Sequence, residues 1–152
     1  MLSDCHMHTE FSLDSEACPE AMVESAAAKG LDAVCITDHE DKDYISEGNQ
    51  WTFDVEPYFT RIGEIRDRYR DRIAVRIGVE IGLQPHLGAY YQNYVRQKPF
   101  DFVIGSVHLI DAKDPYYKEF FEGRSDADAY EETFAETYEN IRKVEDFDVL
   151  GH

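Results

Sequence analysis

Hydrophobic positions along the chain fall into two alternating kinds of segment. Short apolar runs, typical of buried strands, occur at 2–8, 31–37, 73–80, 102–107 and 147–151. Apolar residues at helical spacing fill the intervals, at 19–29, 55–69, 88–98 and 126–144. Pro19 and Gly30 suit the two ends of the first helix, and Ser125 suits the cap of the last. The polar segments 41–54 and 109–124 are predicted as loops.

The alternation of strands and helices predicts an α/β fold. Strands joined by helices pair in parallel through right-handed crossovers. The 152 residues suit one domain, and neither an internal repeat nor a linker divides them. In folds of this kind, chemistry gathers at the carboxyl ends of the strands.

Possible metal ligands follow all five predicted strands. His6 and His8 lie two residues apart, so they point to the same face if 2–8 is a strand. Asp14 lies on a loop that can fold back over the same space. Five of the six histidines fall at strand ends, and His86, in a loop, is predicted to lie on the surface. The predicted ligands are His6, His8, Asp14, His39, Glu80, His108 and His152.

This mixture of imidazoles and carboxylates indicates a catalytic metal centre. It suits Zn, Mn or Fe, whereas a structural zinc site favours closely spaced cysteines. More than four ligands converge, so we expect two to three divalent ions. Such ions can hold a phosphoryl group, generate hydroxide at neutral pH and stabilise the leaving oxygen. Phosphate-ester hydrolysis is the predicted chemistry, and other metal-assisted hydrolyses remain open.

The composition of the chain argues against several classes of partner and location. The net charge is −17, from 15 basic and 32 acidic residues, which argues against nucleic acid and against an anionic membrane surface. No apolar run approaches the roughly 18 residues of a membrane span. The amino terminus lacks the pattern of a secretory signal. The three cysteines are widely spaced and are predicted to be free thiols, so we expect a cytoplasmic protein.

Five short motifs lie at the ends of the predicted strands. They are His6-Met7-His8, Thr37-Asp38-His39, Gly78-Val79-Glu80, Ser106-Val107-His108 and Gly151-His152. In order and in spacing they resemble the motifs of the polymerase and histidinol phosphatase (PHP) family. The loop and helix at 116–138 look most like the histidinol-phosphatase branch.

The resemblance implies a distorted (β/α)7 barrel with a trinuclear metal centre. His6, His8 and Glu80 would bind the first ion, Asp14 and His39 the second, and Glu80, His108 and His152 the third. Glu80 would be central to catalysis. Asp38 is also a candidate catalytic residue, and with Glu40 it would support the ligands or face the substrate. Tyr116 and Tyr117 would either line a lid or simply pack within their loop.

L-Histidinol phosphate, a small substrate of histidine biosynthesis, is the substrate that the resemblance implies. A PHP phosphoesterase of another specificity remains open, whether a nucleotide phosphodiesterase, an exonuclease-like domain or a tyrosine phosphatase. One departure from the family is clear, because its last Asp-x-His motif is absent. The chain is therefore predicted to form about five strands of an incomplete barrel, as a single domain, 1–152, truncated at its carboxyl end. Open sheet edges would favour self-association, and an inactive metal-binding fragment is a further alternative.

Overall fold

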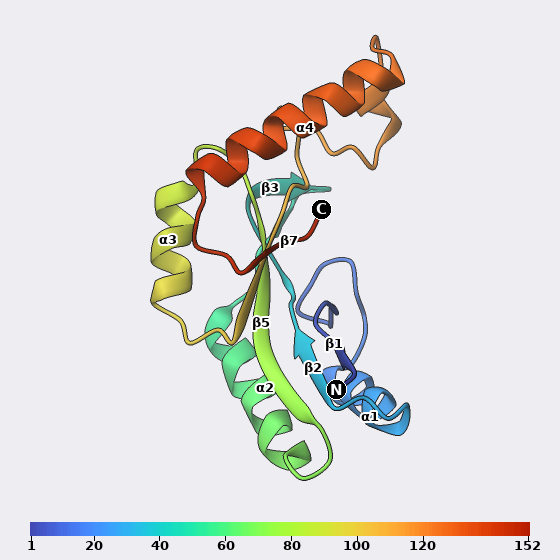
Figure 1. The fold of residues 1–152 in the computed structure, drawn as a ribbon, viewed down its shortest axis with the longest axis vertical. Coiled ribbons are helices and arrows are strands. Elements are labelled where there is room, and N and C mark those ends of the chain that lie inside the picture. The colour runs from blue at the N-terminus through green and yellow to red at the C-terminus, as the bar shows by residue number, and fades with distance from the viewer.

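The computed structural model describes residues 1–152 as a curved parallel sheet with helices packed on its outer face (Figure 1). Its elements run in the order β1 (Ser3–Asp4), α1 (Pro19–Ala28), β2 (Ala33–Ile36), β3 (His39–Ser46), β4 (Asn49–Trp51), α2 (Val55–Tyr69), β5 (Ala74–Gly82), α3 (Gly88–Arg96), β6 (Phe102–Ser106), a 3₁₀ helix (Lys118–Phe121), α4 (Asp126–Lys143) and β7 (Val149–Leu150).

Strand β5 is the centre of the sheet. β2 pairs with its first half and β3 with its second half in unbroken register, from Ala33 opposite Ala74 to His39 opposite Glu80. β6 lies along the other side of β5, and β1 and β7 form the two edges. All these pairs are parallel, and the strands lie side by side in chain order. The predicted α/β fold, an incomplete barrel, is therefore confirmed as a half-barrel.

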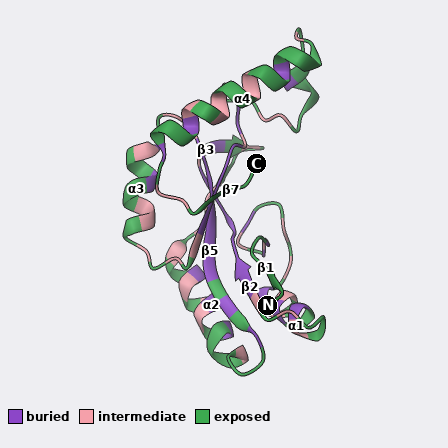
Figure 2. Ribbon diagram, in the orientation of Figure 1, coloured by how far each residue is buried: buried purple, intermediate pink, exposed green.

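Two apolar cores hold the helices against this sheet. Val23 of α1 and Ile62 of α2 pack on the first halves of β2 and β5. Tyr91 of α3 and Val144, which ends α4, pack on β6 and the second half of β5. Figure 2 shows β5 as almost wholly buried, whereas most of α4 is exposed. None of the helices is both long and apolar enough to cross a membrane.

The four helices are as predicted to within about two residues at each end. Their ends carry the expected signals. Pro19 begins α1, and Gly30 follows its end with a positive φ of 80°. Ser125 and Asp128 form a reciprocal capping box at α4, where the sequence suggested a partial one.

The predicted strand at 2–8 is wrong in extent, because only Ser3–Asp4 pairs as a strand. Beyond Asp4 the backbone is irregular, but the amide of Thr37 still donates to the carbonyl of Met7 at 2.9 Å. That bond keeps the segment beside β2, and Met7 faces the core while His6 and His8 face the opposite side. The alternation expected of a strand thus survives where the regular pairing does not.

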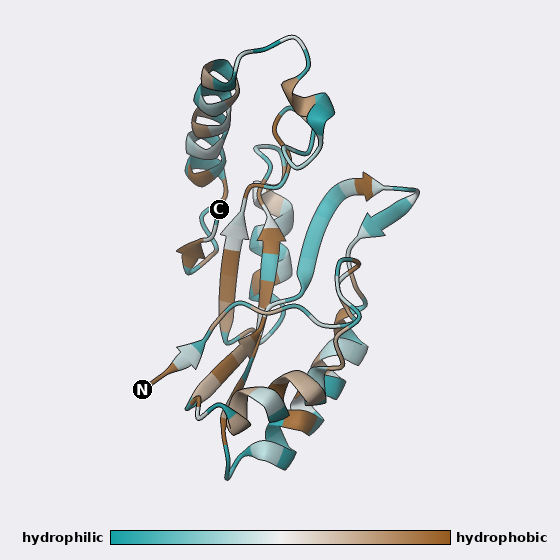
Figure 3. Ribbon diagram, turned by 90° about the vertical axis from the view of Figure 1, so that its right-hand side faces the viewer, coloured by the Kyte–Doolittle hydropathy of each residue, from teal (hydrophilic) through white to brown (hydrophobic).

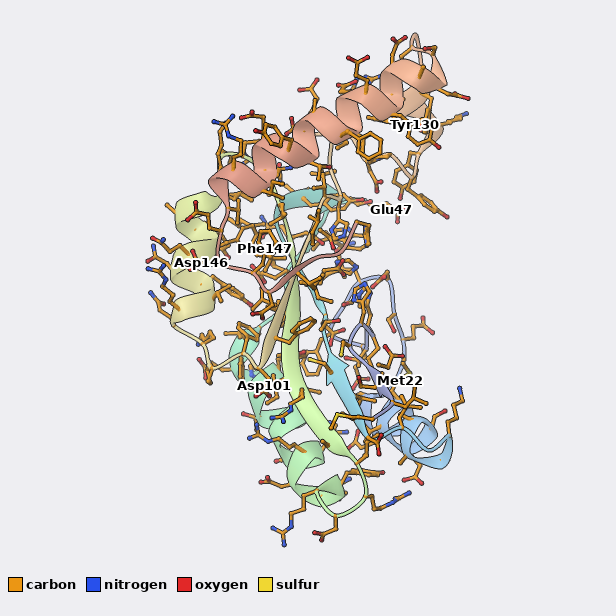
Figure 4. The ribbon with its side chains drawn as sticks, in the orientation of Figure 1. Met22, Glu47, Asp101, Tyr130, Asp146 and Phe147 are labelled. Carbon is orange, nitrogen blue, oxygen red and sulfur yellow. The ribbon has the colours of Figure 1, made fainter.

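The predicted loop at 41–54 is also wrong, because most of it forms the hairpin β3–β4. Glu47 and Gly48 both have positive φ, 52° and 82°, which is the pattern of a tight hairpin turn (Glu47 is labelled in Figure 4). Figure 3 shows β3 as largely hydrophilic, in contrast to the mostly hydrophobic β2 and β6. Charged residues are poor strand formers, and β3 is a strand because both its faces meet polar partners inside the protein.

We expect Tyr58→Phe to lower the free energy of unfolding by about 1–2 kcal/mol. The buried Tyr58 hydroxyl reaches the carbonyl oxygens of Ile36, at 2.9 Å, and Gly78, at 2.8 Å, and so links β2 to β5. Urea denaturation would measure the loss. Tyr130→Phe, on the exposed face of α4 (Figure 4), is the control and should change stability by less than about 0.5 kcal/mol. Equal effects from both changes would show that the hydroxyl bridge is not important.

Candidate metal centre

Histidine side chains that follow four of the parallel strands converge at one end of the half-barrel. β1 leads to His6 and His8, β2 leads to His39, and β6 and β7 lead to His108 and His152. Neighbouring rings among these five lie 4.2–6.3 Å apart, centre to centre. The sixth histidine, His86, lies apart, where its Nε2 is 3.2 Å from the exposed Asp43.

Glu80 is the common neighbour of these rings. Its side chain is fully buried in β5. One oxygen, Oε2, lies 3.0 Å from Nε2 of His8 and 3.4 Å from Nδ1 of His39. The other, Oε1, lies 3.2 Å from Nε2 of His108 and 3.3 Å from Nε2 of His152. His6 is slightly farther, with its Nε2 at 3.7 Å from Oε1.

Asp14 completes a second group. Its Oδ2 lies 3.1 Å from Nδ1 of His8 and 3.6 Å from Nε2 of His39. The loop that carries Asp14 therefore does fold back over the histidines. The ligand atoms form groups of three within 4.8 Å, and the groups are His6, His8 and Glu80; His8, Asp14 and His39; His39, Asp41 and His108; and Glu80, His108 and His152.

The cluster has the unmet bonding needs of a cation site. Four buried atoms lack an aligned hydrogen-bond partner, although each lies close to another polar atom. An unpartnered polar atom in the interior is costly, and bound cations would satisfy the imidazole nitrogens and the Glu80 oxygen among them. The atoms are Nε2 of His8, Nδ1 of His39, Oδ2 of Asp41 and Oε2 of Glu80. The residues present therefore fit a centre of divalent metal ions.

The electrostatics show how strongly this site attracts positive charge. Burial raises the pKa of the Glu80 carboxyl, but the imidazoles of His108, His152 and His8 beside it outweigh burial and hold that pKa far below its usual range. Burial lowers the pKa of His8, but the neighbouring carboxylates of Glu80 and Asp14 raise it to about 9. Burial also lowers the pKa of His108, but hydrogen bonds to Asp41 and Glu80 outweigh burial and raise that pKa to about 10. His6 is an exception, since burial lowers its pKa.

Asp41 is a part of the site that the sequence analysis missed. Its side chain is buried, with Oδ1 2.6 Å from Nδ1 of His108 and Oδ2 2.9 Å from Nδ1 of His39. A signal for it exists in the sequence. If the chain stays extended from Thr37 through Asp41, then His39 and Asp41, two residues apart, share a face.

Asp38 and Glu40 face away from the histidines, so neither lies where a substrate-facing role would put it. Asp38 is fully buried and accepts hydrogen bonds from the amide of Thr9 at 2.5 Å and from the hydroxyls of Thr9 and Ser12 at 2.8 Å. It therefore fixes the loop between His8 and Asp14, which is the supporting position that the sequence analysis gave as one of its two possibilities. Glu40 accepts a hydrogen bond from Tyr90, and burial raises its pKa to about 7.

A cavity of about 620 Å³ opens beside the cluster. Its floor contains His8, Asp14, His39, His108 and His152, and its wall contains Tyr44, Trp51, Asp114, Pro115, Tyr116 and Tyr117. The rings of Tyr44 and Trp51 are stacked, 4.9 Å apart and 4° from parallel, and the Tyr44 hydroxyl donates to Asp114. Tyr116, 86% exposed, lines the cavity together with Tyr117, and the two rings contact each other edge-on at 5.3 Å.

Known proteins resemble the chain over its whole length. The PHP domain matches residues 4–152. The histidinol-phosphatase of Lactococcus lactis subsp. lactis (strain IL1403) is 31% identical over 150 residues, which make up 98% of this chain and 55% of the relative. A probable histidinol-phosphatase of Clostridium acetobutylicum is 30% identical over 152 residues, covering 100% of this chain and 57% of the relative.

Two solved structures also resemble the chain. The crystal structure of the Lactococcus lactis histidinol phosphate phosphatase, complexed with Zn, L-histidinol and phosphate, matches with a TM-score of 0.94 at 30% identity. The match covers 99% of this chain and 57% of that one. A putative histidinol phosphatase of Listeria monocytogenes, 19% identical over 92% of this chain and 60% of its own, shares the fold with a TM-score of 0.64. The chain spans little more than half the length of these relatives, and it belongs to the PHP domain family.

Proposed function

We propose that this chain carries the metal centre of a metal-dependent phosphomonoesterase acting on L-histidinol phosphate. The observation that carries the proposal is Glu80, a buried carboxylate within 3.7 Å of five imidazoles from four strand ends. The Lactococcus lactis relative with this fold was crystallised with Zn, L-histidinol and phosphate. Fold, ligand set and relative all support the same activity.

The side chains offer positions for three divalent ions. His6 and His8 with Glu80 would hold one, and Asp14 with His39 would hold a second beside His8. Glu80 would also reach a third, held by His108 and His152. Zn, the metal of the relative, is the first choice, and Mn and Fe suit the same ligand types. When bound, the ions supply positive charge for a phosphoryl group and activate water.

The cavity beside the cluster suits a small substrate with a cationic end. Its volume of about 620 Å³ is in the usual range for small-molecule sites. The stacked Tyr44 and Trp51 offer a flat aromatic wall, and Asp114 adds a carboxylate next to it. Imidazole and ammonium groups, as in histidinol, bind well to such aromatic faces and carboxylates. The phosphate would lie at the histidine cluster, and the net charge of −17 disfavours a nucleic-acid substrate.

A non-catalytic metal-binding module is the second candidate, supported by the same cluster of histidines and carboxylates. The chain spans 55–57% of the length of its relatives. A panel of phosphate esters with added Zn or Mn separates the possibilities. Release of phosphate from L-histidinol phosphate supports the leading proposal. Preference for another ester points to a different PHP specificity. Bound metal with no turnover identifies a non-catalytic metal-binding module.

We expect Glu80→Gln to weaken metal binding more than the roughly 10–100-fold typical of losing a supporting hydrogen-bond partner. Glutamine keeps the shape but removes the charge that two of the three ion positions share. Metal content after desalting and phosphate release from L-histidinol phosphate would both be measured. His86→Ala, whose side chain lies outside the cluster, is the matched control. Similar small effects from the two changes would contradict a central role for Glu80.

Zinc affinity should increase with pH. In the metal-free chain the raised pKa values of His8, about 9, and His108, about 10, leave both rings protonated at neutral pH. An ion binds the neutral ring, so protons must leave. We expect affinity in chelator-buffered zinc to rise between about pH 6 and pH 8.5, by up to about tenfold per unit for each proton released.

The metal-free chain should show the opposite trend in stability. A histidine whose pKa is raised on folding stabilises the folded state, and this contribution is complete below the unfolded pKa of 6.5. The contribution is lost as the pH rises through the folded pKa values, about 9 for His8 and about 10 for His108. The thermal midpoint of the chain in chelator should therefore fall as the pH is raised above about 7. Parallel pH profiles with and without zinc would rule out this linkage.

We also propose that the isolated domain, 1–152, self-associates through its open edges. β1 and β7 flank an apolar groove of about 570 Å³, whose lining includes Leu2, Phe102, Ile104, Val149 and Leu150. Unpaired edges with apolar neighbours favour pairing with another chain. Light scattering should give a mass above the 17.6 kDa of one chain. A lasting monomer at that mass, at tens of micromolar protein, would refute the proposal.

A further inference from the structure

Asp41 occupies a position between two ion sites without belonging to the family motifs of this chain. Its Oδ1 accepts a hydrogen bond from Nδ1 of His108 at 2.6 Å. Its Oδ2 lies 2.9 Å from Nδ1 of His39 and has no aligned hydrogen-bond partner. Each oxygen of one buried carboxylate therefore faces a different candidate ligand.

The hydrogen bond to His108 decides which of its nitrogens can hold an ion. A neutral imidazole carries one proton, and the nitrogen without it is the one that binds metal. With the proton on Nδ1 and directed at Asp41, Nε2 of His108 is free. That nitrogen lies 3.2 Å from Oε1 of Glu80, which is also 3.3 Å from Nε2 of His152. The ring is thus presented to the ion position of the group Glu80, His108 and His152.

We propose that Asp41 is a positioning residue that fixes His108 with Nε2 toward this ion position and limits the orientation of His39 from the other side. The inference rests on the proposed metal centre. It adds a supporting carboxylate that links two ion positions through one side chain. Partners of this kind hold the ring of a metal-binding histidine in place and strengthen its binding.

The neighbouring strand is shaped to admit Asp41. A Cβ added to Gly82 of β5 would lie 1.7 Å from Oδ1 of Asp41 and 2.7 Å from its Cγ. Only glycine leaves room for the carboxylate there. The φ of Gly82 is not of the left-handed type, so backbone freedom does not explain the glycine. Space for Asp41 is the physical reason for it.

The backbone on both sides of Asp41 is also fixed. The hydroxyl of Tyr91, a fully buried residue of α3, donates to the carbonyl of Glu40 at 2.8 Å and accepts from the amide of Lys42 at 3.0 Å. One hydroxyl therefore clamps the residues before and after Asp41. The side chain of Gln84 donates to the carbonyl of Lys42 at 2.9 Å as well. Together these contacts determine where the carboxylate of Asp41 lies.

Zinc binding tests the inference without relying on turnover. Four variants would be titrated with Zn²⁺ by calorimetry, and their metal content determined after desalting. Asp41→Ala should weaken at least one zinc site by roughly 10–100-fold. Asp41→Asn, which keeps an oxygen for His108, should lose less. Gly82→Ala should reproduce the effect of Asp41→Ala, although residue 82 has no ligand atom. Gly63→Ala, on α2 with nothing within 4 Å of the added Cβ, is the matched control.

The proton position on His108 gives a readout that a purely structural role would not change. Long-range ¹H–¹⁵N correlation spectra of the zinc-loaded chain should show His108 protonated at Nδ1 and bound through Nε2. In Asp41→Ala this preference should weaken, while circular dichroism verifies that the fold is kept. A proton at Nε2 in the unchanged chain would overturn the proposal. So would Gly82→Ala binding zinc as tightly as the Gly63→Ala control.

Two further results would distinguish a failure of the positioning role from a failure of the metal centre itself. If Asp41→Asn lost zinc as completely as Asp41→Ala, Asp41 would be a direct ligand, and the positioning role would be wrong while the metal centre stood. If the unchanged chain bound no zinc at all, the proposed metal centre would fail, and the inference about Asp41 would fail with it.

Discussion

A buried carboxylate surrounded by imidazoles is the interaction on which the rest of this structure depends. Glu80 is fully buried in the central strand, where an uncompensated negative charge would be very costly. Five histidines from four segments of the sheet provide the compensation, either as protonated rings or through ions that they hold. Because four strands deliver these rings to one side chain on a fifth strand, the register of the sheet is tied to Glu80.

The position of the metal ligands is largely predictable from the sequence, since it depends on connectivity alone. Parallel strands bring their carboxyl ends to one edge, so histidines that follow successive apolar runs must meet there. The order of the strands and the limits of the four helices follow from apolar spacing and from residues such as Pro19 and Ser125. Even His6 and His8 reach the same space, although their segment is not a regular strand beyond Asp4.

What the sequence does not reveal depends on contacts between distant segments. The residues of β3 are too polar to read as a strand, and they pair because His39 and Asp41 meet the ligand cluster while Glu40 meets Tyr90. Asp38 lies next to a ligand in sequence but points to Thr9 and Ser12, because neighbours along a strand face opposite sides. The position of Asp41 in the site also depends on a contact between distant segments, because its partner His108 lies far along the chain.

The β3–β4 hairpin contributes both to the candidate metal cluster and to the wall of the cavity. At its start, Asp41 holds His108 and lies against His39. Farther along, Tyr44 stacks on Trp51 to form the wall of the cavity, and the same Tyr44 donates to Asp114. A shift of β3 along β5 would therefore move the supporting carboxylate and the aromatic wall together. Gly82 and Tyr91 oppose that shift, one by close contact and the other by hydrogen bonds on both sides of Asp41. A substitution in the wall that shifted β3 would thus also displace Asp41 from His108.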